Sequence, residues 1–155
     1  MQRREFFRNI LGWGTAAPVL WAGLCSPMPL WAAWDEAAFR EEDFARSIQA
    51  VFGNTPIEDS PEVVLKMPDR WQNGAVVPME ISTTLKEVES FTVFVAKNPT
   101  PLTGIYKLGK HVEPFVSTRI KVDGPDTTQV LVVVKANGKL YRTTHTVQVM
   151  VGGCT

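Results

Sequence analysis

The chain has 155 residues, of which 45% are hydrophobic, with 16 basic and 16 acidic side chains. A chain of this length can form one domain with a hydrophobic core of its own. The balanced charge argues against a nucleic-acid-binding protein, because such proteins carry an excess of basic residues. Only two histidines and two cysteines are present, so a metal site, which needs clustered ligands of these kinds or carboxylates, is not expected.

Residues 1–33 carry the parts of a twin-arginine export signal. Arg3 and Arg4 form the arginine pair, and an uncharged, mainly apolar run follows from residue 10 to residue 21. Glycine and proline interrupt this run, which favours a cleaved signal over a retained membrane anchor. We therefore expect export of the folded chain to the periplasm and cleavage near Trp34, which leaves 13 basic and 15 acidic residues.

Cys25 lies within the predicted signal, where a lipoprotein would need a small residue before the cysteine. Leu24 stands in that position, so lipidation is not favoured. Cys154 is then the only thiol of the exported chain. A single thiol in an oxidising compartment has no intramolecular disulfide partner and is useful mainly as a reactive group.

Residues 34–151 predict one all-β domain with a short N-terminal helix. The helix is expected over 35–52, where apolar residues recur at three- and four-residue spacing, with Asp35 as its cap and Gly53 as its stop. Seven short runs of β-branched and apolar residues follow, separated by clusters of turn-forming residues. These runs are Val63–Met67, Val76–Leu85, Phe91–Ala96, Ile105–Leu108, Phe115–Val122, Gln129–Ala136 and Leu140–Val151. This pattern predicts an antiparallel β-sandwich of immunoglobulin type.

The last two predicted strands are joined by Asn137 and Gly138, which favour a type I′ turn. After this turn, every second residue from Tyr141 to Val151 is expected on one face of the final strand. That strand leads directly into Gly152. A rigid sheet is therefore expected to end where a glycine-containing arm begins.

Residues 152–155, with the sequence Gly152-Gly153-Cys154-Thr155, form this predicted C-terminal arm. Glycine gives the backbone its widest range of conformations, and chain ends are poorly ordered unless tied down. The sequence therefore predicts a reactive thiol on a flexible tether. Two uses of the thiol stay open: it can hold a substrate covalently, or it can join two copies of an exported interaction module through a Cys154–Cys154 disulfide.

No other residues indicate catalysis. His111 falls in a turn-like segment and His145 in a strand, and each is expected to be an ordinary histidine rather than a metal ligand. The sequence lacks a Cys-x-x-Cys pair, a nucleophile elbow and a phosphate-binding glycine loop. We therefore expect no enzyme activity and no bound metal or cofactor. The larger aromatic residues are expected in the core or an interface rather than in a ligand site: Trp34, Phe39, Phe44, Phe52 and Trp71.

Two apolar runs are continuous rather than alternating, Val76–Met79 and Val130–Val134. Such runs are typical of strands that are covered on both faces. The second face can be covered by the domain itself or by another subunit, and the sequence leaves both interpretations open.

These features together resemble the SoxY family, the sulfur-carrier subunits of the periplasmic Sox thiosulfate-oxidising system. The resemblance covers the export signal, the helix at 35–52, the strands from residue 63 onward and, most specifically, Gly152-Gly153-Cys154. Members of the family typically end in Gly-Gly-Cys-Gly-Gly. In this chain Thr155 follows the cysteine instead.

The resemblance implies a non-catalytic carrier in which Cys154 is the covalent attachment site and Gly152 and Gly153 are a swinging arm. It implies a heterodimer with a smaller SoxZ-like β-sandwich subunit. It also implies transient contacts with a haem-containing cytochrome that couples thiosulfate to the thiol, with a hydrolase that releases sulfate and, in some systems, with a sulfane dehydrogenase.

Overall fold

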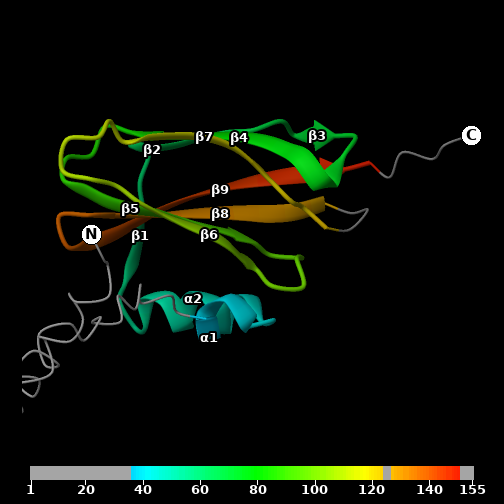
Figure 1. The fold of residues 1–155 in the computed structure, drawn as a ribbon, viewed down its shortest axis with the longest axis horizontal. Helices are drawn as coiled ribbons and strands as arrows, with labels where there is room; N and C mark the ends of the chain where they lie inside the picture. Colours follow the sequence, from blue (N-terminus) through cyan, green and yellow to red (C-terminus); the bar gives the residue numbers. More distant parts are fainter. Residues whose placement is uncertain (1–35, 124–126, 151–155) are drawn as a thin grey trace, which may run out of the picture. The chain divides into compact units, whose positions relative to one another are not determined.

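Two β-sheets and two short helices make up residues 36–123 and 127–150, which are the residues described by a computed structural model (Figure 1). The helices are α1 (Glu36–Arg40) and α2 (Phe44–Phe52), and a 3₁₀ helix, η1 (Gly74–Val76), precedes β4. The strands are β1 (Ile57–Asp59), β2 (Val63–Lys66), β3 (Arg70–Trp71), β4 (Val77–Thr83), β5 (Val88–Val95), β6 (Leu102–Lys107), β7 (Phe115–Ile120), β8 (Thr127–Ala136) and β9 (Lys139–Val149). The predicted signal, residues 1–33, lies outside the described residues.

The strands form the two-sheet, all-β fold predicted from the sequence. The larger sheet has the order β1-β9-β8-β5-β6, with β3 also paired to β9, and the smaller sheet has the order β2-β4-β7. All seven predicted strands are present, with ends that differ by a few residues. Two further strands that the sequence did not predict, β1 and β3, pair parallel with β9, whereas the longer strands pair antiparallel.

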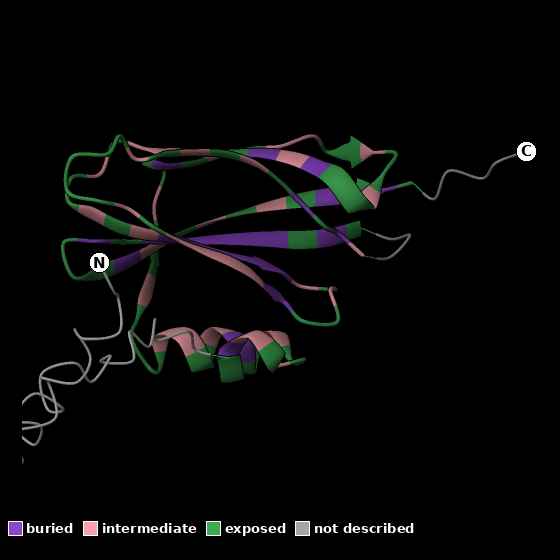
Figure 2. Cartoon of the chain, viewed as in Figure 1, coloured by how far each residue is buried: buried purple, intermediate pink, exposed green. Residues whose placement is uncertain are grey.

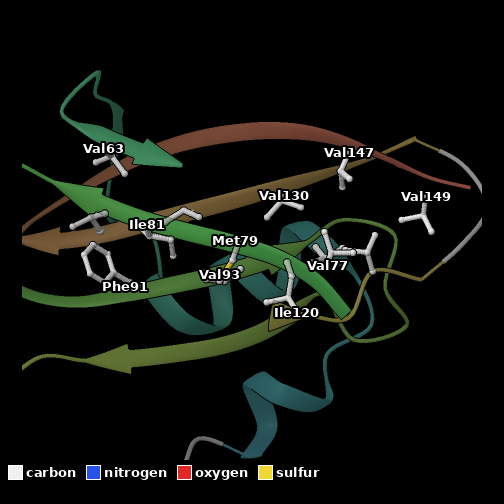
Figure 3. Close-up of a cluster of buried hydrophobic side chains, with 14 of the residues drawn as sticks. Val63, Val77, Met79, Ile81, Phe91, Val93, Ile120, Val130, Val147 and Val149 are labelled. Carbon is white, nitrogen blue, oxygen red and sulfur yellow. The ribbon is translucent and has the colours of Figure 1, made fainter. Parts of the chain in front are cut away.

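The main core lies between the two sheets (Figure 3). Inward-facing residues of β4, β5, β8 and β9 alternate with residues on the outer faces, as expected for strands with one face in the core. Burial of each such side chain contributes about 1.5–3 kcal/mol. Those that are no more than 1% exposed include Val77, Met79, Ile81, Phe91, Val93, Val130, Val132, Val134 and Val147.

Helices α1 and α2 cover the other face of the larger sheet. Leu131 and Val133 of β8 and Phe94 of β5 belong to a second buried cluster, against which Phe44 and Phe52 of α2 pack. The centroid of the Phe94 ring lies 6.5 Å from that of Phe44, edge to face, and 6.2 Å from that of Phe52. These centroid distances are within the range of favourable aromatic pairs.

These contacts decide the open question about the run 130–134. Figure 2 shows β8 as buried over most of its length. One face of β8 lies in the main core and the other lies in the second cluster, so this chain itself covers both faces. The run 76–79 is also explained within the domain: Val77 and Met79 point into the core, while Val76 is 44% exposed. The continuous runs therefore need no second subunit.

Of the five aromatic residues predicted to lie in the core or an interface, the four that the structure describes pack against a buried cluster. Phe39, Phe44 and Phe52 pack against the second cluster, and Trp71 packs against the main core. Trp34 lies outside the described residues.

The prediction of one continuous helix over 35–52 is wrong, because the chain leaves the helical conformation between α1 and α2 and so forms two helices. Asp43 has an extended backbone, and its Oδ1 accepts a hydrogen bond from the Arg46 amide at 2.8 Å. A side chain that caps a new helix in this way competes with continuation of the previous one. Gly53 ends α2 as predicted, with φ of 62° and its amide donating to the Gln49 carbonyl.

The turn between β8 and β9 agrees with the predicted type I′ turn, because Asn137 and Gly138 both have positive φ, 51° and 71°. In β9 the alternate residues from Tyr141 onward are buried or half-buried, ending with Val147 and Val149, while the residues between them are exposed. The predicted alternation is therefore confirmed as far as Val149.

The first parallel strand, β1, is tied to β9 by an ion pair as well as by the backbone. Arg142 donates from Nε to Asp59 Oδ1 at 2.8 Å and from a terminal nitrogen to Oδ2 at 3.2 Å. This two-point hydrogen bond lowers the pKa of Asp59 below its ordinary value.

Within residues 36–123 and 127–150, no helix is long and apolar enough to cross a membrane.

Candidate functional site at the end of β9

The predicted site residues, Gly152, Gly153 and Cys154, lie outside the described residues. The structure describes the chain just before them: β9 ends at Val149, and Met150 follows it (Figure 1). The residues that surround this position decide how firmly the base of the predicted arm is held.

Strand β8 holds one edge of β9 along its whole length. The antiparallel register runs from Ala136 opposite Lys139 to Thr127 opposite Gln148. Near the end of β9, Val149 is only 5% exposed and belongs to the main core. The end of β9, from which the predicted arm continues, is therefore part of the sandwich.

Strand β3 holds the other edge of β9 at its end. Its two residues pair parallel with β9, Arg70 opposite Gln148 and Trp71 opposite Val149. The Gln148 amide donates to the Asp69 carbonyl at 2.8 Å, and the Met150 amide donates to the Trp71 carbonyl at 2.9 Å. Because Trp71 also packs against the main core, β3 extends the hydrogen-bonded part of β9 as far as Met150.

The 3₁₀ helix η1 packs tightly against the same end of β9. A Cβ atom built on Gly74 would lie 2.3 Å from the Val122 carbonyl oxygen and 3.1 Å from Val149 Cγ1. The Val122 amide donates to the Gly74 carbonyl at 2.7 Å. Asn98 fixes the neighbouring backbone, since its side chain donates to the Lys121 carbonyl and accepts from the Asp123 amide. Only glycine fits position 74 without movement of backbone.

We expect Gly74→Ala to destabilise the domain by about 1–3 kcal/mol, the usual cost of adding volume to a tightly packed site. The clash is with a backbone oxygen, which cannot rotate away. Urea unfolding measures the effect. Gly109→Ala is the matched control, because its new Cβ would meet only Val112 Cγ2 at 3.5 Å. Equal stability of the two variants would contradict the close packing of η1.

The surface around the end of β9 combines apolar and polar side chains, the polar ones including the exposed Arg70 and Gln148. Met150 and Val76 are each 44% exposed, and Trp71 is half-buried. Lys121 and Asp123 form an ion pair nearby at 2.9 Å, and His145 Nε2 lies 3.1 Å from Asp69 Oδ1.

Neither histidine is placed for metal binding. His145 Nε2 is buried, and although it lies close to the Asp69 carboxylate, the two atoms do not have hydrogen-bond geometry. His111 is exposed in the segment between β6 and β7. Over the described ranges, no group of three or more histidine, cysteine or carboxylate side chains could hold a metal ion.

The sequence model of one protein family, described as sulfur oxidation protein SoxY, matches residues 48–154. The chain belongs to the SoxY family. The matched residues extend from α2 through β9 and include Cys154. No protein with curated annotation matches the chain significantly.

Among solved structures, this chain is similar to the sulfur carrier protein SoxY from Chlorobium limicola f thiosulfatophilum. The two share 33% sequence identity with a TM-score of 0.62, and the match covers 75% of this chain and 99% of that one. A sequence identity of 33% over nearly the whole of that chain supports membership of the same family as well as a shared fold.

Sequence reasoning missed β3, Gly74 and Asn98, which build the base of the arm. A two-residue strand has no periodicity to detect. The Gln-Asn-Gly sequence at 72–74 indicates a turn, but nothing local relates that turn to the end of β9, which is far away in sequence.

Proposed function

We propose that this chain is a covalent carrier of sulfur intermediates in thiosulfate oxidation, holding its substrate on Cys154 and presenting it to partner enzymes. Membership of the SoxY family over a segment that includes Cys154 carries the proposal. It is supported by the likeness to a sulfur carrier protein and by the firm attachment of β9 up to Met150, four residues before the cysteine.

The proposed cycle uses the Cys154 thiolate as the nucleophile. In the coupling step a bond forms between Cys154 Sγ and the sulfane sulfur of thiosulfate; the thiol loses its proton and two electrons pass to a haem-containing cytochrome. In the next step a hydrolase adds water to the terminal sulfone, the sulfur–sulfur bond to that group breaks, and sulfate leaves. One proton of the water stays on the resulting Cys154 persulfide and the other goes to solvent.

In this cycle the chain holds and presents the sulfur intermediate, while the partner enzymes catalyse the reactions. The cytochrome takes the electrons, the hydrolase releases sulfate, and a sulfane dehydrogenase, where the host has one, oxidises the remaining sulfur. Gly152 and Gly153 form the swinging arm that lets one thiol reach each of these sites in turn.

Intact mass spectrometry of protein purified without reductant tests the function. The expected result is a monomer that carries adducts of the mass of thiosulfate or of added sulfur atoms, all lost on reduction. A disulfide-linked dimer without such adducts would instead support the alternative of an interaction module that dimerises through Cys154.

A small β-sandwich subunit is the proposed stable partner, bound on the outer face of the smaller sheet. Val64 of β2 is 41% exposed and Phe115 of β7 is 46% exposed. They lie in one row across the sheet, because Ser82 of β4 is the register partner of both. Exposed apolar side chains that lie together favour association.

The double substitution Val64→Glu and Phe115→Glu is expected to weaken this heterodimer at least tenfold, because it places two charges in an apolar contact. The dissociation constant measured by calorimetry gives the size of the effect. Met150→Glu changes an equally exposed apolar residue elsewhere and serves as the control. If both variants bind the partner as tightly as the native chain, the partner lies on another face.

The proposed location is the periplasm, reached by twin-arginine export. Arg3→Lys with Arg4→Lys is expected to leave the protein in the cytoplasm together with its partner subunit, because this route carries folded cargo and depends on the arginine pair. Cell fractionation measures the distribution. Unchanged periplasmic protein would contradict the proposed route.

A further inference from the structure

A groove lies at the end of the domain where β9 begins. It is bordered by the end of α2, by β6 and by segments that connect neighbouring strands, and its volume is about 1410 Å³. The turn at Asn137 and Gly138 lines it, and β9 runs from that turn to Val149, roughly 30 Å away at about 3.3 Å per residue. Small-molecule sites usually measure about 300–1,000 Å³. The groove is therefore large enough for a segment of another chain.

Hydrogen bonds hold the walls of the groove. Asn137 donates from its side chain to the Lys86 carbonyl at 3.1 Å and from its amide to the Glu87 carbonyl at 3.4 Å. The Leu108 amide donates to the Glu89 carbonyl at 2.9 Å. These bonds join the turn after β8, the segment before β5 and the end of β6, so the groove is formed before a ligand arrives.

Lysine side chains surround the groove and outnumber the carboxylates beside them. Four exposed lysines and two glutamates line it. Lys135 forms an ion pair with Glu89 at 2.7 Å. Within the described ranges, no ion pair involves the other three lysines, Lys86, Lys107 and Lys110. The groove is therefore positively charged and attracts anionic groups.

The less exposed side chains of the groove are mainly apolar. Val51 and Phe52 of α2 and Ile105 of β6 are half-buried, and two small polar residues of β5, Ser90 and Thr92, lie among them. A ligand with both apolar and acidic side chains can contact this floor and the lysines together. It therefore matches the groove better than an inorganic anion, which has no apolar part.

Strand β6 is also a free edge of the larger sheet, because among the described strands it pairs only with β5 (Figure 1). In an antiparallel pair, the backbone groups of successive residues point alternately toward the partner strand and away from it. The Leu108 amide points toward β5, where it binds the Glu89 carbonyl. Ile105 and Lys107 therefore present their backbone groups at the free edge, and they also line the groove. Such an edge can accept a strand from another chain.

Charge decides against a second copy of this chain as the added strand. Two β6 strands paired with each other would bring two lysine-lined grooves together, and like charges that face each other destabilise paired strands. An acidic segment instead gains attraction from the same lysines.

We propose that the groove binds an extended acidic segment of a partner protein, which adds as a strand to the free edge of β6. Side chains pair across neighbouring strands, so an acidic residue of the segment lies beside Lys107 and an apolar residue two positions away lies beside Ile105. Lys86 and Lys110 attract further carboxylates. The groove is remote from the end of β9, and its role does not depend on the carrier function.

A peptide of seven residues that alternates glutamate and valine, blocked at both ends, is the probe. Fluorescence anisotropy is expected to show binding of this peptide to the purified chain and no binding of a peptide that alternates lysine and valine. Lys107→Glu is expected to weaken binding about tenfold or more, because it replaces an attraction by a repulsion at the centre of the contact. Lys66→Glu is the matched control, since Lys66 is an exposed lysine of β2 in the other sheet, and its binding should stay within about twofold of native.

Hydrogen exchange at saturating peptide tests the strand addition itself. The amides of Ile105 and Lys107 are expected to exchange about tenfold more slowly or less with the peptide bound, because each gains or lies beside a new backbone hydrogen bond. The Leu108 amide, already bonded to β5, should change little. Absence of binding, equal loss in Lys107→Glu and Lys66→Glu, or binding without protection of Ile105 and Lys107 would each overturn the proposal, whatever the role of Cys154.

Discussion

Cys154→Ser is expected to abolish thiosulfate-dependent oxidation in a system reconstituted with the partner subunit and the partner enzymes. A serine hydroxyl cannot form the sulfur–sulfur bond that holds the intermediate, and it is a weak nucleophile near neutral pH. The chain's other cysteine, Cys25, lies in the predicted signal and offers no replacement. Activity should fall to the background without carrier, and sulfur adducts should disappear from the intact mass.

The same variant should fold normally, because β9 is held by β8 and β3 before the arm begins. Thermal unfolding nearly equal to that of the native chain is therefore the control. Substantial oxidation by a stably folded Cys154→Ser protein would rule out a covalent carrier role, whatever partners the chain binds.

Gly152→Pro combined with Gly153→Pro is expected to reduce turnover with the partner enzymes by about an order of magnitude or more. Proline fixes φ near −65°, so Cys154 can take up far fewer positions relative to Met150. A displacement of about 1 Å at a reacting group can lower a rate about 100-fold. Turnover is measured at saturating carrier with each enzyme separately.

Alkylation of Cys154 by iodoacetamide is the control for this variant, since a small reagent needs no defined position of the arm. Its rate should match that of the native chain. Gly152→Ala with Gly153→Ala should lie between the native and proline variants, because alanine restricts the backbone less than proline does. Native turnover in the proline variant would mean that the glycines do not act as a swinging arm.

Much of the fold could be predicted from sequence because its signals are local. The turn at Asn137 and Gly138 requires positive φ at both positions, and this residue pair is among the few that adopt it readily. The alternation in β9 follows from one face lying in the core. The break between α1 and α2 was missed, because the capping hydrogen bond of Asp43 outweighed the helical spacing of the apolar residues around it.

The sequence by itself determined seven of the nine described strands and the hairpin that ends in β9, since each depends on residue types close together in the chain. Only the tertiary structure decided what covers the outer face of β8. Helix α2 and β8 are about 80 residues apart in the sequence, and Phe44 and Phe52 pack in one cluster with Leu131 and Val133 of β8 only through the path of the chain. The tertiary structure also decided how the end of β9, before the predicted arm, is held. Two residues of β3 and one glycine hold the end of β9 through hydrogen bonds and a close approach, and contacts between segments so far apart leave no pattern in either one.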